Sequence, residues 1–171
     1  KESNMHGIVC VPRHSNPTGH TFSDDNVQKL FELLVPFKDN FSIFWDNAYA
    51  CHDFDETIQQ TPADQIAKRL GLEDNLFQVG STSKITLAGS GISFISSSTE
   101  NLSKFIDFRN AITPGPNKMN QGMHVKYFES VSIEQQMKEL KKIIKPKFEL
   151  VDSILKPLKD AGLCLYEKPT G

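Results

Sequence analysis

Short apolar runs alternate along this chain with segments whose apolar residues recur every three or four positions. Four runs have the length and composition of buried strands: residues 7–12, 41–46, 76–79 and 92–95. The stretches between them carry the spacing of helices that are apolar on one face. Strands that alternate with helices are typical of an α/β fold, so the sequence predicts a mostly parallel sheet covered by helices.

Polar residues and helix breakers indicate where the first helices begin and end. Ser23 precedes a helix predicted over about 24–37. Thr61 is predicted to cap the next helix, with Pro62 at its first position, and Gly71 should end it.

The second half of the chain is mainly helical. Helices are predicted over 99–108 and from 118 to 128, and Ser132 is predicted to begin a long helical stretch that ends near 160. Pro146 and Pro157 should kink or break this last helix because proline removes a backbone donor.

The chain ends on an apolar segment that resembles a strand. Residues 163–166 alternate in the way expected of a strand and stand just before the last residue, Gly171. A strand needs a partner for its backbone hydrogen bonds. We therefore expect the natural protein to continue beyond this segment.

Composition excludes several classes of protein. The chain has 171 residues, 38% hydrophobic and 23% charged, with a formal net charge of -2. This balance does not favour binding to nucleic acid or to a membrane surface. No apolar run approaches the ~18 residues that a membrane-spanning helix needs. The three cysteines are widely spaced and form no disulfide pattern: Cys10, Cys51 and Cys164. This usage indicates a protein of the reducing cytoplasm.

The histidines do not indicate a metal centre. Their spacing fits no zinc pattern, so no metal site is expected. The five are His6, His14, His20, His52 and His124.

Three polar loops each follow a predicted strand. The first contains Asn16, the second begins at Asp46 and contains Tyr49, and the third runs from Ser81 to Lys84. In open α/β sheets, ligands bind at the carboxyl ends of the strands. The pattern therefore predicts that these three loops meet at one edge of the sheet.

Two of these side chains have more than one interpretation. Asp46 stands at the end of a buried strand, where a carboxylate needs a cationic partner such as a protonated pyridine nitrogen, or where it could cap a turn. Lys84 could be a nucleophile activated by burial, or a solvated surface lysine. A phosphate-binding P-loop is excluded, because Ser83 stands where that motif requires glycine.

The ordered set of three loops resembles the aminotransferases of fold type I, which use pyridoxal 5'-phosphate (PLP). The similarity is greatest to the bacterial type Ic aspartate aminotransferases. Four segments carry it: SNPTGHTFS (15–23), WDNAYACH (45–52), STSKITLAGSGISF (81–94) and PGPNKMNQ (114–121).

The resemblance implies a three-layer α/β/α architecture. Residues 1–130 would form part of the PLP-binding large domain, and residues 131–171 the long connecting helix and the start of a small domain. It also implies a homodimer with shared active sites.

The resemblance assigns catalytic roles. It implies that Lys84 forms the Schiff base with PLP and later moves a proton, while Asp46 keeps the pyridine nitrogen protonated. Tyr49 and Asn16 would donate hydrogen bonds to the phenolic oxygen of the ring, and Ala48 would lie against a ring face.

Phosphate binding departs from the family pattern. Ser81 and Ser83 would bind the phosphate, but the arginine that many relatives carry about eight residues after the lysine is missing from residues 88–92. Asn117 and Lys118 follow a turn that related enzymes send into the neighbouring subunit. We expect them to supply the charge that is lost at this position.

The implied reaction is transfer of an amino group between an L-amino acid and a 2-oxo acid, with aspartate and 2-oxoglutarate expected as substrates. Two alternatives remain open. One keeps PLP but changes the reaction to that of a β-lyase, decarboxylase or racemase. The other is an aminotransferase-like sensor domain of a transcription regulator.

Overall fold

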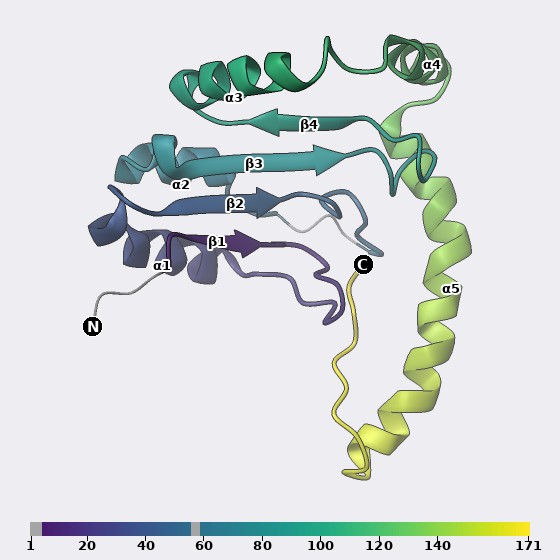
Figure 1. Cartoon of the computed structure of the whole chain (residues 1–171). Coiled ribbons are helices and arrows are strands. Elements are labelled where there is room, and N and C mark those ends of the chain that lie inside the picture. Colours follow the sequence, from purple (N-terminus) through teal and green to yellow (C-terminus); the bar gives the residue numbers. More distant parts are fainter. Residues whose placement is uncertain (1–4, 56–58) are drawn as a thin grey trace.

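The structure, a computed structural model, describes residues 5–55 and 59–171. Within these ranges one four-stranded sheet runs in the order β1 (Gly7–Cys10), β2 (Ser42–Asp46), β3 (Leu76–Ser81) and β4 (Ser93–Ser96). The first three strands are parallel, and β4 is antiparallel to β3. Figure 1 shows β1, β2 and β3 all pointing toward the same long helix. The predicted α/β class with a mostly parallel sheet is therefore confirmed.

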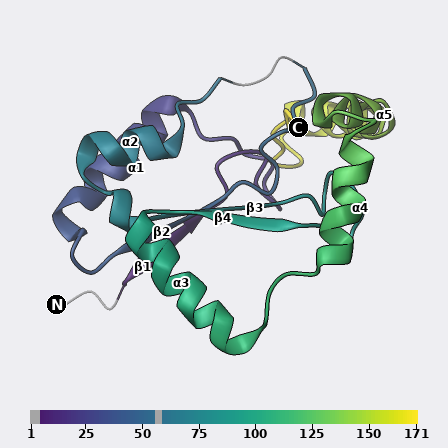
Figure 2. The same ribbon diagram turned by 90° about the horizontal axis from the view of Figure 1, so that it is seen from above.

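Helices lie on both sides of this sheet. They are α1 (Asp24–Leu34), α2 (Ala63–Leu70), α3 (Thr99–Ile112), α4 (Lys118–Phe128) and α5 (Ile133–Asp160), with short 3-10 turns η1 (Val35–Phe37) and η2 (Glu73–Asn75). Figure 2 shows α1 and α2 on one face and α3 on the other, while α4 and α5 lie past one end of the strands. This arrangement is part of an α/β/α fold.

The hydrophobic core lies between the sheet and the helices α1 and α2. Phe31 of α1 and Ile43 of β2 are fully buried, and Trp45 is nearly so. The rings of Phe31 and Trp45 meet edge to face with centroids 5.6 Å apart, a favourable geometry for aromatic pairs. This packing fixes β2, and thereby the position where the loop after Asp46 begins.

The helix boundaries follow their capping residues in most places. The side chains of Ser23 and Ser132 accept hydrogen bonds from the backbone N–H groups of Asn26 and Gln135, as expected of N-caps. Gly71 ends α2 with a φ of 66°, a left-handed conformation that favours glycine. These three predictions are confirmed.

Thr61 is not a helix cap, so that prediction was wrong. The backbone N–H and the hydroxyl of Thr61 both donate to the carboxylate of Asp24, each at 2.8 Å. Pro62 takes the N-cap position of α2 and provides no side-chain hydrogen bond. A long-range contact with α1 has replaced the local cap.

Three further expectations need correction. The first strand ends at Cys10, two residues earlier than predicted. Residues 163–166 form no strand, because no strand of the described part runs beside them to share backbone hydrogen bonds. The helix α5 continues through Pro146 and Pro157, so the prolines do not break it, while its axis curves along its length (Figure 1).

Candidate active site

Three loops meet at the carboxyl edge of the parallel strands, as the sequence predicted. Asn16 follows β1, Tyr49 follows β2 and Lys84 follows β3, and all three line one cavity of about 380 Å³. The opposite wall is an apolar side of α5, formed by Met137, Leu140, Ile144 and Phe148. Ligand sites of α/β proteins occur at this edge because the loops there converge from neighbouring strands.

Lys84 and Tyr49 are direct neighbours in this cavity. The Lys84 Nζ lies 5.6 Å from the centroid of the Tyr49 ring, within the range of a cation–π contact. Lys84 sits in a single helical turn, in which the N–H groups of Ile85 and Thr86 donate to the carbonyl of Thr82 at 2.8 Å. The turn presents the amine of Lys84 toward the loop that carries Tyr49.

Asp46 is the last residue of β2 and is only partly exposed. Its Oδ1 accepts a hydrogen bond from the backbone N–H of Ala48 at 3.0 Å, which forms a tight local turn. This contact is the turn cap that the sequence left open as an alternative. It employs one carboxylate oxygen, so the second oxygen can still accept from a ligand.

Ser81 and Ser83 form a small cluster of hydroxyl groups. The Ser81 hydroxyl donates to Ser83 Oγ at 2.8 Å, and the Ser83 N–H donates back to Ser81 Oγ at 2.9 Å. Both side chains are half-buried at the end of β3. They do not line the cavity that contains Lys84.

Hydrogen bonds that the sequence did not predict hold the two ends of the Lys84 loop together. The Thr82 N–H donates to Ile92 O at 2.8 Å, and the Ile92 N–H donates to Thr82 Oγ1 at 2.9 Å. The buried ring of His124 in α4 lies 2.8 Å from the Thr86 hydroxyl and 3.1 Å from that of Thr82. These contacts join positions that are up to 42 residues apart, so no local sequence pattern could have predicted them.

Gly91 has no room for a side chain. A Cβ there would lie 2.6 Å from the Ser83 nitrogen and 2.7 Å from its Cα, and closer still to Ser83 Oγ. Any larger residue at Gly91 would therefore require the Lys84 loop to move. This excludes an arginine from Gly91, which lies seven positions after Lys84 (91 − 84).

Asn117 and Lys118 lie at the start of α4 and are both exposed. Asn117 caps the helix, since its side chain accepts from the Asn120 N–H at 3.1 Å. The Asn120 amide in turn donates to the carbonyl of Gly91 at 3.4 Å. The first turn of α4 is thus adjacent to the Lys84 loop of the same chain.

His52 and Cys51 also line the cavity, next to Tyr49. The His52 Nε2–H donates to the Lys84 carbonyl at 3.3 Å, and its ring meets that of Tyr49 edge on at 5.5 Å. Burial holds the pKa of His52 below its ordinary value. Burial, helped by the charge of Asp53, raises the pKa of the Cys51 thiol, which favours an unreactive protonated form.

No helix within residues 5–55 and 59–171 is long and apolar enough to cross a membrane. Within the same ranges, no group of three or more histidine, cysteine or acidic side chains could hold a metal ion.

Comparison with known proteins gives consistent matches over the whole chain. A family model for aspartate amino-transferase matches residues 1–171. An aspartate aminotransferase of Corynebacterium glutamicum is 34% identical over 174 residues, which cover 100% of this chain and 40% of that protein. The chain therefore spans about two fifths of the length of this relative.

Solved structures agree with this similarity. The crystal structure of an aspartate transaminase from Corynebacterium glutamicum has a TM-score of 0.85 and 34% identity, and the match covers 96% of this chain and 39% of that one. An α-aminoadipate aminotransferase from Thermus thermophilus, solved with N-(5'-phosphopyridoxyl)-L-leucine, has a TM-score of 0.75. Its identity is 19%, over 95% of this chain and 40% of that one, so it supports the fold alone.

Proposed function

Since the chain belongs to the aspartate amino-transferase family, we propose that it serves the transfer of an amino group between an L-amino acid and a 2-oxo acid. One observation carries this proposal: Asn16, Tyr49 and Lys84 come from three separate loops and line a single cavity. Aspartate and 2-oxoglutarate are the substrates that we expect.

The side chains at this edge are suited to pyridoxal phosphate. Lys84 would supply the amine that holds the aldehyde group of the cofactor. A pyridine nitrogen requires a carboxylate, which Asp46 supplies with its second oxygen. A phosphate requires several donors, and the hydroxyls of Ser81 and Ser83 lie together at the end of β3.

Each residue would have a defined task. When bound, the cofactor supplies an electron sink for the carbon that loses a proton. Lys84 would move that proton with its amine once released from the cofactor. Asp46 would hold a proton on the ring nitrogen, and Asn16 and Tyr49 would donate to the ring oxygen. Ala48 would lie against a ring face.

The protein is further proposed to act as a cytoplasmic homodimer. Residues 1–130 would belong to the large domain, of which 1–4 and 56–58 lie outside the described residues, and residues 131–171 would lead into the small domain. Asn117 and Lys118 would contribute to phosphate binding in the partner subunit, replacing the charge that Gly91 cannot carry. The exposed amine at the N-terminus of α4 is chemically suited to this task.

The assignment of Lys84 can be tested by chemical trapping. Borohydride reduction of the PLP-loaded protein should attach the label permanently to the peptide that contains Lys84. Lys141 is the internal control, because it lines the same cavity from α5 and donates instead to the carbonyl of Asp55. Label on Lys141, or on any lysine other than Lys84, would show that the assignment is wrong.

The reaction itself can be tested by product analysis. Incubation of the full-length enzyme with aspartate and 2-oxoglutarate should yield both glutamate and oxaloacetate, whereas a β-lyase, decarboxylase or racemase would not form this pair. In Asp46→Ala, kcat should fall roughly 10²-fold or more, because a pair worth a few kcal/mol in the transition state is lost. Retained PLP with near wild-type turnover would exclude Asp46 as the partner of the ring.

A further inference from the structure

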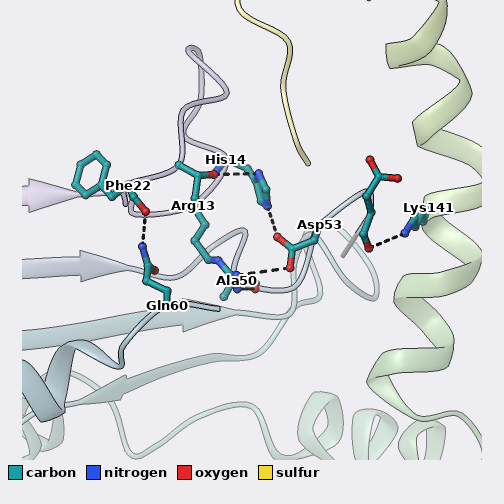
Figure 3. A network of polar contacts seen from close by, with 9 residues as sticks. Arg13, His14, Phe22, Ala50, Asp53, Gln60 and Lys141 are labelled. Carbon is teal, nitrogen blue, oxygen red and sulfur yellow. Dashed lines mark hydrogen bonds and ion pairs between the residues drawn. The ribbon is translucent and has the colours of Figure 1, made fainter. Parts of the chain in front are cut away.

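A buried group of polar side chains, formed by Arg13, His14 and Asp53, joins the loop of Asn16 to the loop of Tyr49. His14 Nε2 donates to Asp53 Oδ1 at 2.8 Å, and the Arg13 guanidinium lies 3.6 Å from Asp53 Oδ2. The exposed fractions of these side chains are 12% for Arg13, 2% for His14 and 8% for Asp53. Figure 3 shows both residues of the first loop reaching across to the carboxylate of the second.

Additional contacts fix each end of this group. Arg13 Nη1 donates to the carbonyl of Ala50 at 2.6 Å, directly after Tyr49 in the chain. The Thr21 hydroxyl accepts from the backbone N–H of His14 at 3.0 Å and lies 3.3 Å from Nδ1 of its ring. The first loop is thus held at both of its ends, by Arg13 and His14 before Asn16 and by Thr21 after it.

The backbone of His14 and the contacts of residues 170–171 add two further signs of constraint. His14 has a φ of 48°, a left-handed conformation that residues other than glycine seldom adopt unless their surroundings require it. Gly171 packs so closely on the His14 ring that a Cβ would lie 2.6 Å from Nδ1. The Phe54 N–H donates to Thr170 O at 2.8 Å, so this segment also covers the loop of Asp53.

We propose that Arg13, His14 and Asp53 are positioning residues. They would hold Asn16 and Tyr49 at the separation that lets both side chains donate hydrogen bonds to the ring oxygen of the bound cofactor. The inference rests on the proposed function, because it assumes that both side chains donate to the cofactor. His14 lies two residues before Asn16, and Asp53 lies four residues after Tyr49. Two donors carried by different loops can converge on one atom only if the loops keep their separation, and a buried ion pair enforces such a separation more strictly than solvated side chains do.

The first test needs no cofactor. In the apoprotein, Asp53→Ala should speed amide hydrogen exchange by about tenfold or more in both residues 15–21 and 47–53, because it removes the carboxylate that His14 and Arg13 share and so loosens both loops. Asp53→Asn keeps an acceptor for His14 and should have a smaller effect. Asp55→Ala is the matched control: this exposed carboxylate in the same loop pairs with Lys145 of α5. Unchanged exchange in Asp53→Ala would overturn the proposal.

The second test reads the ring oxygen directly. In the proposed complex, the ring oxygen of the cofactor attracts the proton on the nitrogen of Lys84, and hydrogen bonds donated to that oxygen weaken this attraction. If Asn16 and Tyr49 are displaced, the nitrogen should hold its proton to a higher pH. We therefore expect the pH midpoint of the absorbance band of the lysine-bound cofactor to rise by about 0.5–1 unit in Asp53→Ala, the size of one modest hydrogen bond. The Asp53→Asn variant should shift it less, in the same direction, and remains available if Asp53→Ala does not fold.

The two tests separate the possible failures. Faster exchange with an unchanged midpoint in both Asp53 variants would show that the ion pair joins the loops without positioning Asn16 and Tyr49, and would overturn the inference. A shift of equal size in Asp55→Ala would do the same. If wild type binds PLP without any absorbance band from a lysine-bound cofactor, the proposed function fails, and the exchange result still decides whether Asp53 joins the loops.

Discussion

Replacing Gly91 by alanine tests the close approach at the base of the Lys84 loop. The new methyl group would meet three atoms of Ser83, two of which are the backbone nitrogen and Cα at 2.6 and 2.7 Å. Favourable contacts between carbon atoms lie at about 3.5–4.0 Å, so the overlap is roughly an ångström. A rotation of the Ser83 side chain cannot relieve a clash with backbone atoms. The backbone at Ser83 and the backbone at Gly91 must therefore move apart.

The expected cost follows from two effects. Overpacking by one methyl group in a tight site costs about 1–3 kcal/mol. Separation of Ser83 from Gly91 also stretches the two hydrogen bonds between Thr82 and Ile92, each worth about 0.5–1.5 kcal/mol. Since the two bonds are stretched and not lost, we expect Gly91→Ala to lower the free energy of unfolding by about 2–4 kcal/mol, in the lower part of the summed range.

Denaturant unfolding of Gly91→Ala and a matched variant, Gly122→Ala, measures this cost. Gly122 lies inside α4, where a Cβ would meet nothing within 4 Å, so alanine should raise the free energy of unfolding by about 0.5–1 kcal/mol. The two substitutions should have opposite signs. Adding Ser83→Ala to Gly91→Ala should restore only part of the loss. A Gly91→Ala protein as stable as wild type would refute the reasoning.

Three further outcomes are expected. Phe31→Ala should lower the free energy of unfolding by about 3–5 kcal/mol, whereas Phe37→Ala, 59% exposed, should change it little; equal effects in denaturant titrations would contradict the core assignment. Because burial lowers the pKa of His52, its neutral form is favoured on folding: its contribution is intact above about pH 6.5 and is lost as the pH falls through the lowered pKa. His52→Gln should therefore flatten the decline of unfolding free energy between pH 7.5 and 5, and an unchanged slope would argue against this. Lys118→Ala should weaken PLP binding by about 1.5–3 kcal/mol in fluorescence titrations if its ammonium reaches a phosphate, and an unchanged affinity would remove Lys118 from the site.

Local patterns determined much of this protein. The alternation of apolar runs and helical spacing predicted all four strands to within a few residues, because a strand or helix buries its own apolar side. Parallel order of the strands then brought Asn16, Tyr49 and Lys84 to one edge. Their place at this edge needed no tertiary information, since each of them lies within six residues of the end of its own strand.

Contacts between distant segments decided the rest. Thr61 donates to Asp24, 37 residues away, and does not cap its own helix. His14 pairs with Asp53 at a separation of 39 residues. Pro157 stayed inside a continuous α5, and residues 163–166, without a neighbouring strand, remained irregular. A hydroxyl, an imidazole or a glycine has the same appearance in a sequence whether it faces water or a partner. Only the packing of one loop on another determines which partner lies within hydrogen-bonding distance, and therefore which of these residues shape the site.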